Sequence, residues 1–211
     1  IALLLHPSLR GRAFIQTMVK RGVLPSEILL MTGSDTFSFP DNINYKDYYN
    51  IHELPSQTLK SNNIKFHKIE SLDCNSNQVL KSLKSLESDW IIYTGGGILN
   101  KRILNIGKKF IHVHPGRLPD YRGSTCFYYS LIKEGKCSFS TFIMDEKLDS
   151  GQILYQRDSI PDKDIDLDYI FDPWMRAQTI CDVLENFDFN GEIKSSVNEI
   201  QSSNMYYVIH P

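Results

Sequence analysis

The stretch KFIHVHPGRLPDYRG, residues 109–123, decides the expected fold of this chain. It begins as a strand in which His112 and His114 share one face while the intervening Val113 points to the other. Pro115 then makes continuation within a central ladder unfavourable, because proline has no backbone N–H to donate. The two histidines are therefore expected at the carboxyl end of a buried strand, which is where open α/β sheets bind ligands.

Strand-like and helix-like segments alternate along the rest of the first 135 residues. Short apolar runs are typical of strands buried on both faces, and segments with helical spacing lie between them. Strands are expected in residues 1–6, 27–33, 64–70, 89–97 and 109–115, and helices in residues 7–22, 77–87, 100–107 and 126–135. This order predicts an open, mostly parallel α/β sheet.

The pattern changes after Gly135. Residues 138–146 and 151–161 read as two strands around a turn, so antiparallel strands are expected at this edge of the sheet. Residues 164–187 predict a long helix, in which Pro173 marks either a kink or a restart.

These segments suggest a division of the chain into two parts. We expect a catalytic domain over residues 1–160. Residues 161–211 are expected to add a helix and a strand, the latter near MYYVIHP at residues 205–211, that serve dimerisation or line the substrate site.

Composition limits the class of protein. The chain has 211 residues, 23 of them basic and 25 acidic, for a formal net charge of −2. This balance gives no electrostatic signature of nucleic-acid binding. No apolar run is long enough to span a bilayer, and the four cysteines are too scattered for a metal knuckle or a disulfide framework. A reducing, cytoplasmic compartment without membrane attachment is therefore expected.

Three segments bring chemically active groups to one edge of the predicted sheet. His112 and His114 end one strand, and the glycine triplet at residues 95–97 ends another. Glycines let a backbone approach a ligand closely. Asp149 lies with Gly151 in the turn between the two antiparallel strands. Imidazoles with a carboxylate can move a proton or hold a metal ion.

A metal site is the competing hypothesis. Two histidines two residues apart, with a distant aspartate, suit a zinc- or iron-dependent hydrolase such as a deacetylase that uses His112 and His114. The loop that follows, with LPDYRG at residues 118–123, favours proton transfer over metal binding, because a metal site does not need such a loop.

The segment HVHPGRLPDYRG, followed by MDEKLDSGQIL at residues 144–154, resembles the core of the folate-dependent formyltransferases. This family has a Rossmann-like fold and transfers a formyl group from N10-formyltetrahydrofolate to an amine. The resemblance implies that His114 is the catalytic histidine, which acts as acid and base, and that Asp149 is its electrostatic partner. It implies no metal.

Two positions depart from the family's pattern. The family has asparagine, which hydrogen-bonds the formyl oxygen, where this chain has His112, and commonly serine where it has Gly116. A neutral imidazole also donates one N–H if its tautomer is right. Such a donor stabilises a transition state by about 3–4 kcal/mol. The resemblance thus implies that His112 is the formyl-oxygen donor, with an inactive folate-binding module as the alternative.

The resemblance also implies where folate lies. GGGILNKRIL, residues 95–104, is similar to the family segment whose backbone receives the pterin ring. For Arg122, a structural role bonded to a carbonyl or carboxylate is an equal alternative. The residues expected to contact folate are Gly97, Ile98, Leu99, Leu118, Pro119, Arg122 and Asp145.

The acceptor is expected at the same edge. His6 ends the first strand and is either structural or substrate-facing, while Arg10 and Arg12 of HPSLRGR could bind a phosphate. The residues expected to contact the substrate are His6, Arg10, Arg12 and Tyr121.

Elimination within the family favours a sugar as the acceptor. Members acting on methionyl-tRNA add a C-terminal β-barrel and a basic surface, whereas only residues 161–211 follow the last predicted sheet strand of this slightly acidic chain. HPSLRGR is not the phosphate loop of the ribonucleotide enzymes, and the family's formyl-folate hydrolases usually carry a further regulatory domain in front. We therefore expect a bacterial sugar N-formyltransferase acting on a nucleotide-linked amino sugar for surface glycans, for example a precursor of pseudaminic acid. A homodimer is compatible with the aromatic C-terminal segments.

Overall fold

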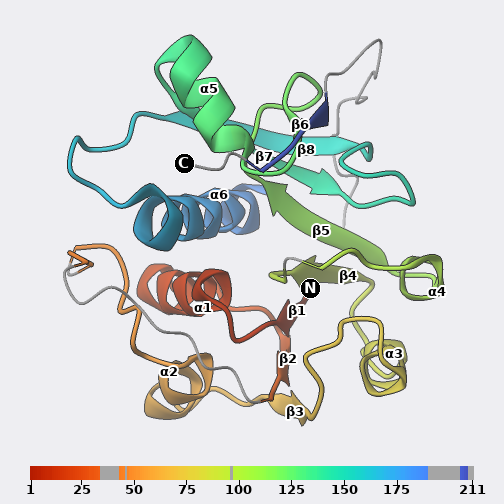
Figure 1. Cartoon of the computed structure of the whole chain (residues 1–211). Coiled ribbons are helices and arrows are strands. Elements are labelled where there is room, and N and C mark those ends of the chain that lie inside the picture. The colour runs from red at the N-terminus through yellow and green to blue at the C-terminus, as the bar shows by residue number, and fades with distance from the viewer. Residues whose placement is uncertain (34–42, 46, 96, 190–204, 209–211) are drawn as a thin grey trace.

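The computed structural model describes residues 1–33, 43–45, 47–95, 97–189 and 205–208. Its main strands are β1 (Ala2–Leu5), β2 (Glu27–Met31), β3 (His67–Ile69), β4 (Trp90–Tyr93), β5 (Lys109–His114), β7 (Cys137–Ile143) and β8 (Ile153–Ser159). They form one sheet in the order β3-β2-β1-β4-β5-β7-β8 (Figure 1). The strands from β3 to β5 are parallel, and β7 and β8 are antiparallel. The predicted sheet with antiparallel C-terminal strands is confirmed.

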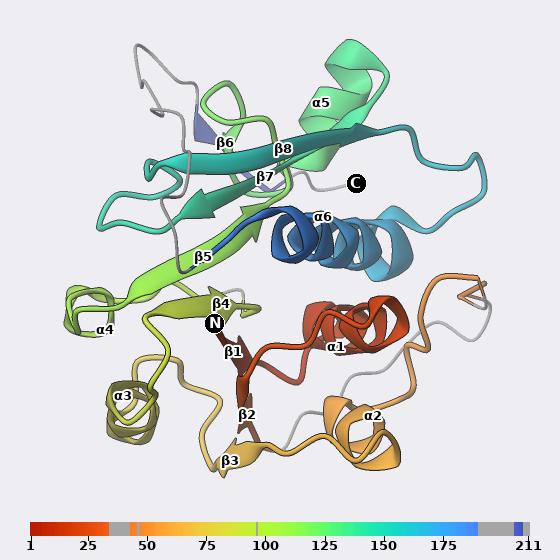
Figure 2. The ribbon, with the colours of Figure 1, turned by 180° about the vertical axis from the view of Figure 1, so that it is seen from behind.

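Helices cover both faces of this sheet, as the two views show (Figures 1 and 2). They are α1 (Leu9–Arg21), α2 (Pro55–Ser61), α3 (Asn77–Lys84), α4 (Lys101–Leu104), α5 (Cys126–Glu134) and α6 (Asp172–Asn186). Buried residues of α1 and α6 share a core with one face of the sheet, and those of α3 and α4 share a core with the other. The β1 residues are 0% exposed, which explains why that strand reads as an unbroken apolar run.

Local signals set the helix ends. The Ser8 side chain caps α1 at its start, and Gly22 ends it with a left-handed φ of 69°. Pro173 falls in the first turn of α6, directly after a π-helical turn at Leu167–Phe171. The backbone is helical on both sides, so the proline marks the point where the π turn passes into α6, and its missing N–H falls at this change of hydrogen-bond pattern.

The part of the chain after residue 160 packs onto the preceding elements. Helix α6 lies along α1, and Arg21 of α1 pairs with Asp182 and Glu185 of α6. A second, two-stranded sheet joins β6 (Arg122–Gly123) to β9 (Met205–Tyr206). The boundary at residue 160 stays a prediction.

Some expectations fall on residues that the structure does not describe. They are Gly96 of the triplet and residues 209–211 of the predicted C-terminal strand. Of the helices within the described ranges, none combines the length and the apolar character needed to cross a bilayer.

Candidate active site

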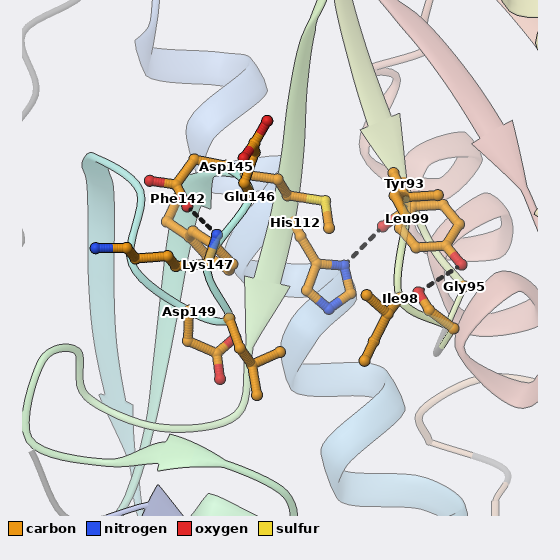
Figure 3. A pocket seen from close by; sticks show the side chains of 13 residues that line it. Tyr93, Gly95, Ile98, Leu99, His112, Phe142, Asp145, Glu146, Lys147 and Asp149 are labelled. Atoms are coloured by element: carbon orange, nitrogen blue, oxygen red, sulfur yellow. Dashed lines mark hydrogen bonds between the residues drawn. The ribbon is translucent and has the colours of Figure 1, made fainter. Parts of the chain in front are cut away.

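A cavity of about 250 Å³ opens at the predicted edge of the sheet (Figure 3). One wall is the loop after β4, and the other is the loop that joins β7 to β8. His112 of β5 and Asp149 both contribute to the lining. Four of the residues predicted to contact folate line this cavity, namely Gly97, Ile98, Leu99 and Asp145.

His112 is held by a backbone carbonyl. Its Nδ1 lies 2.9 Å from the carbonyl oxygen of Tyr93, and its ring packs against the rings of Tyr93 and Phe142. A carbonyl oxygen only accepts, so Nδ1 carries the proton of the neutral imidazole. Nε2 is then an acceptor, and Figure 3 shows that this side of the ring turns toward the cavity.

The surroundings of His112 keep it neutral. Burial lowers its pKa well below 6.5, and the positive charges of Arg176 and Arg10 lower it further. The Tyr93 carbonyl opposes this in part. A neutral ring whose one N–H is used by Tyr93 has none left for a formyl oxygen. The donor role predicted for His112 therefore does not fit this tautomer.

His114 is buried and uses the opposite ring nitrogen. It is 3% exposed, and its Nε2 donates to the carbonyl oxygen of Tyr121 at 2.7 Å. Its Nδ1 lies 3.5 Å from Oδ1 of Asp149. Burial lowers the pKa of His114, and the Asp149 carboxylate opposes that shift. One added proton between Nδ1 and the carboxylate would turn a contact of two acceptors into a charge-assisted hydrogen bond.

The turn around Asp149 explains the spacing of the Asp-x-Gly motif. Asp149 has a left-handed φ of 52°, which aspartate tolerates better than most residues. A side chain on Gly151 would place its Cβ 1.6 Å from the carbonyl oxygen of Ile143, so only glycine closes the turn. The second carboxylate oxygen of Asp149 accepts the N–H of Gly123 at 2.9 Å.

The loop after the histidines supports this turn. Arg122 is 8% exposed and donates to the carbonyl oxygen of Leu148. The Tyr121 hydroxyl donates to Glu134 at 2.6 Å, and its ring stacks on Tyr206 with centroids 5.3 Å apart. For Arg122 this geometry favours the structural alternative. The substrate contact predicted for Tyr121 has no support in its buried position.

Leu118 and Pro119 do not line the cavity. Leu118 packs with Phe142 and Ile153, and its N–H donates to Oγ of Ser140 at 3.0 Å. The Leu118–Pro119 peptide bond is cis. The folate contact predicted for this pair stays a prediction.

The three residues near the first strand differ in position. Arg12 is 3% exposed and donates to the carbonyl oxygen of Ile51, which points to a role in fixing that loop. The N–H of His6 donates to Oγ1 of Thr94 at 2.9 Å. Arg10 reaches the carbonyl oxygen of Gly95, in the cavity wall, at 3.4 Å. Arg10 therefore lies beside the cavity and contacts its wall.

Sequence reasoning missed Arg176. Its Nε donates to Asp172 and one terminal nitrogen donates to the carbonyl oxygen of Val113, both at 2.8 Å. It is 7% exposed and its charge lowers the pKa of both histidines. The available signal was an arginine amid apolar residues in WMRAQTI, since a buried charge is rare unless it is paired.

The described ranges contain no group of three His, Cys, Asp or Glu side chains placed to hold a metal ion. His112 and His114 instead direct ring nitrogens to two different backbone carbonyls. The metal-hydrolase hypothesis gains no support from this part of the chain.

Comparison with known proteins finds one matching family and several related sequences. A family described as formyl transferase matches residues 37–165, which is more than half of the chain. A methionyl-tRNA formyltransferase of Thermodesulfovibrio yellowstonii is 43% identical over 89 residues, which are 40% of this chain and 29% of that protein. The chain spans about half or less of the length of the curated relatives it matches.

Solved structures share the fold. A sugar N-formyltransferase from Shewanella sp FDAARGOS_354 superposes with a TM-score of 0.57 at 15% identity, covering 98% of this chain and 76% of that one. A phosphoribosylglycinamide formyltransferase from Streptococcus pneumoniae gives a TM-score of 0.60 at 15% identity, covering 87% and 97%. At this identity the likeness concerns the fold alone.

Proposed function

Because this chain belongs to the formyl transferase family, we propose that it transfers a formyl group from N10-formyltetrahydrofolate to a primary amine. The observation that carries the proposal is one cavity that joins the glycine loop, His112 and Asp149 at the carboxyl edge of the sheet. Acyl transfer to an amine needs a site where a proton can be moved beside the reacting carbon. Two imidazoles and a carboxylate meet that need without a metal.

The cavity suits one end of the folate. Pockets for drug-sized ligands have volumes of about 300–1,000 Å³. At about 250 Å³, this cavity fits a flat ring system with its formyl-bearing nitrogen, and leaves the glutamate tail outside. Ile98 is 74% exposed and Leu148 is 44% exposed beside it, and both would be covered by a bound ring. Backbone groups at Gly97 and Leu99 and the Asp145 carboxylate offer acceptors and donors to ring nitrogens.

For the acceptor, we propose the amine of a small sugar that is linked to a nucleotide. Arg10 supports this, because it is a cation beside the cavity wall and suits a phosphate. The net charge of −2 supports a small acceptor over a long polyanion. The sugar N-formyltransferase with the same fold makes this chemistry compatible with the scaffold.

Methionyl-tRNA is the second candidate acceptor. The observation in its favour is the name of the curated relatives, one of which shares 43% identity over 89 residues. A tRNA acceptor predicts a rate that falls steeply as salt rises, since phosphate contacts release counterions.

The test is product analysis with N10-formyltetrahydrofolate in the presence of EDTA. The acceptors are UDP-, dTDP- and GDP-linked 4-amino sugars, glycinamide ribonucleotide and methionyl-tRNA, and products are identified by mass spectrometry. We expect one formyl group on one sugar. Formylated methionyl-tRNA would establish the second candidate, and formate release without formamide would identify a hydrolase. Unchanged formyl-folate with every acceptor would overturn the proposal.

A further inference from the structure

The ring nitrogen that His112 turns to the cavity is basic, whereas an asparagine side chain has no basic atom. The Tyr93 carbonyl oxygen accepts a hydrogen bond from the Nδ1–H of His112, and the two atoms lie 2.9 Å apart. This leaves Nε2 with a lone pair. No described residue hydrogen-bonds to this Nε2, and Figure 3 shows the ring inside the cavity lining. An asparagine amide cannot take up a proton near neutral pH, whereas an imidazole can.

The three carboxylates that line the cavity are already engaged in other contacts. Asp145 accepts the N–H of Lys147 at 2.7 Å as well as the Ser150 hydroxyl, and Glu146 pairs with Lys101 at 2.6 Å. Asp149 accepts the Gly123 N–H and faces His114. His114 itself, at 3% exposure, is not part of the lining.

We infer that Nε2 of His112 is the proton acceptor for the attacking amine in the reaction proposed above, on which this inference rests. The amine nitrogen forms a bond to the formyl carbon, the carbonyl electron pair moves to oxygen, and an amine proton passes to Nε2. The oxyanion then collapses, the bond from carbon to folate N10 breaks, and N10 takes the electron pair with the proton from Nε2. The products are a formamide and tetrahydrofolate, and His112 returns to its starting tautomer.

Its environment prepares His112 for this cycle. The Tyr93 carbonyl holds the ring and fixes which nitrogen is free. Burial with the charges of Arg176 and Arg10 lowers the pKa, so the ring is neutral before the reaction and returns the proton readily afterwards. The proton-transfer role that the resemblance assigns to His114 thereby passes to His112, while His114 positions Asp149.

Charged and titratable groups face His112 from several elements. In order along the chain, those whose charge acts on it or that share its cavity are Arg10, Tyr93, His114, Asp145, Glu146, Lys147, Asp149 and Arg176. An acidic limb of the pH profile is assigned to His112 only if it disappears when that ring alone is replaced.

The first test reads the tautomer and requires no activity. A two-bond proton–nitrogen correlation spectrum of the nitrogen-15-labelled protein distinguishes protonated from unprotonated ring nitrogens in its six histidines. The His112 signals are identified by their loss in His112→Gln. We expect a protonated Nδ1 and an unprotonated Nε2 at pH 7.5. A protonated Nε2 would overturn the inference, whatever the activity.

The second test is kinetic. With the best acceptor, we expect His112→Gln and His112→Asn to lower kcat by roughly 10²- to 10⁴-fold, the usual contribution of a general base. We also expect both to lose the acidic limb below pH 6.5. The matched control is His67→Gln, the same change at an exposed position of β3, which should leave rate and profile unchanged. Binding of 5-formyltetrahydrofolate, followed by calorimetry, checks that each variant is folded.

The outcomes separate the two claims. If the wild-type protein forms no formamide from any acceptor, the proposed function fails and the inference fails with it. If the wild-type protein is active and His112→Gln keeps its rate within threefold with the same pH profile, the proposed function stands and the inference alone is overturned.

Discussion

His112 and His114 stand two residues apart on one face of β5, yet they belong to opposite sides of the site. His112 donates a hydrogen bond from Nδ1 to the carbonyl oxygen of Tyr93, and its Nε2 faces an open cavity. His114 donates a hydrogen bond from Nε2 to the carbonyl oxygen of Tyr121, and its Nδ1 faces the buried carboxylate of Asp149. The sequence presents them as a pair, whereas the backbone carbonyls beside them give them opposite tautomers.

This difference separates the site into an open side and a closed side. The open side is the cavity with His112, and it offers groups to a ligand. The closed side is His114, Asp149, Gly123 and the strand pairing of Gly123 with Tyr206. Asp149 accepts the Gly123 N–H here and lies beside His114. These contacts hold Asp149 at the cavity edge.

The largest effect is expected when the charge on the closed side is removed. Asp149→Asn keeps the left-handed backbone, since asparagine tolerates it, but it removes the negative charge 3.5 Å from His114. We expect kcat to fall by roughly 10²- to 10⁴-fold, or about 3–5 kcal/mol. Steady-state kinetics measures this, with Asp120→Asn as the control at an exposed position of the preceding loop. An active Asp149→Asn would mean that the closed side only supports the fold.

The next effect tests the contact between β6 and β9. Gly123 has a φ of 108°, and a Cβ there would lie 2.1 Å from the carbonyl oxygen of Tyr206. We expect Gly123→Ala to lower the free energy of unfolding by about 2–3 kcal/mol, because both strain and a backbone clash result. Urea unfolding measures the change.

Gly135→Ala is the control for the strain alone. Gly135 also has a left-handed φ, of 71°, but nothing lies within 4 Å of an added Cβ. Its loss of stability should be smaller, at about 1 kcal/mol. Equal losses of stability at both glycines would show that β9 moves away from the added side chain at no energetic cost.

The sequence foretold the open side better than the closed side. Pro115 and the apolar runs indicated where parallel strands end, and that edge carries the cavity. Gly97 and Asp149 could be assigned to it because local motifs mark turns. A two-residue pairing such as β6 with β9 has no periodicity to detect, since it joins segments more than eighty residues apart.

The tautomers of His112 and His114 could not be predicted from the sequence for a related reason. Which nitrogen of His112 carries the proton depends on the carbonyl of Tyr93 in the adjacent strand. Arg176 reaches Val113 from a helix sixty-three residues further on, so its influence on both histidines required the packing of α6. Patterns along a chain predict strands and turns, but not which polar atoms meet across elements.

A smaller effect is expected from the family's serine at Gly116. A Cβ there would lie 2.9 Å from Nε2 of His114 and 2.8 Å from the carbonyl oxygen of Tyr121. We expect Gly116→Ser to push these groups apart and lower the free energy of unfolding by about 1–2 kcal/mol, as overpacking does. The nitrogen-15 spectrum should change for His114 and remain as it is for His112. A change at His112 instead would contradict the separation into two sides.

The smallest effect is expected from removing a positive charge beside the cavity. Arg10 carries one of the positive charges that lower the pKa of His112, and its own pKa falls to about 10 because it is desolvated and faces Arg176. Arg10 therefore remains charged at neutral pH. Arg10→Met removes that charge, so the pKa of His112 rises toward 6.5 and the acidic limb of kcat moves to higher pH. We expect this upward shift to be the smallest of the effects, because burial and Arg176 still lower the pKa of His112 in the variant.

Lys20→Met is the control for this pH shift, because it removes a charge from an exposed position of the same helix. Solvent screens the charge of an exposed lysine from the His112 ring, so the pH profile of Lys20→Met should match that of the wild-type protein. A limb that moves to lower pH in Arg10→Met would show that a group other than a cationic imidazole controls the acidic limb. A limb that moves equally in both variants would show that net charge, and not the position of Arg10 beside the cavity, sets the pKa of His112.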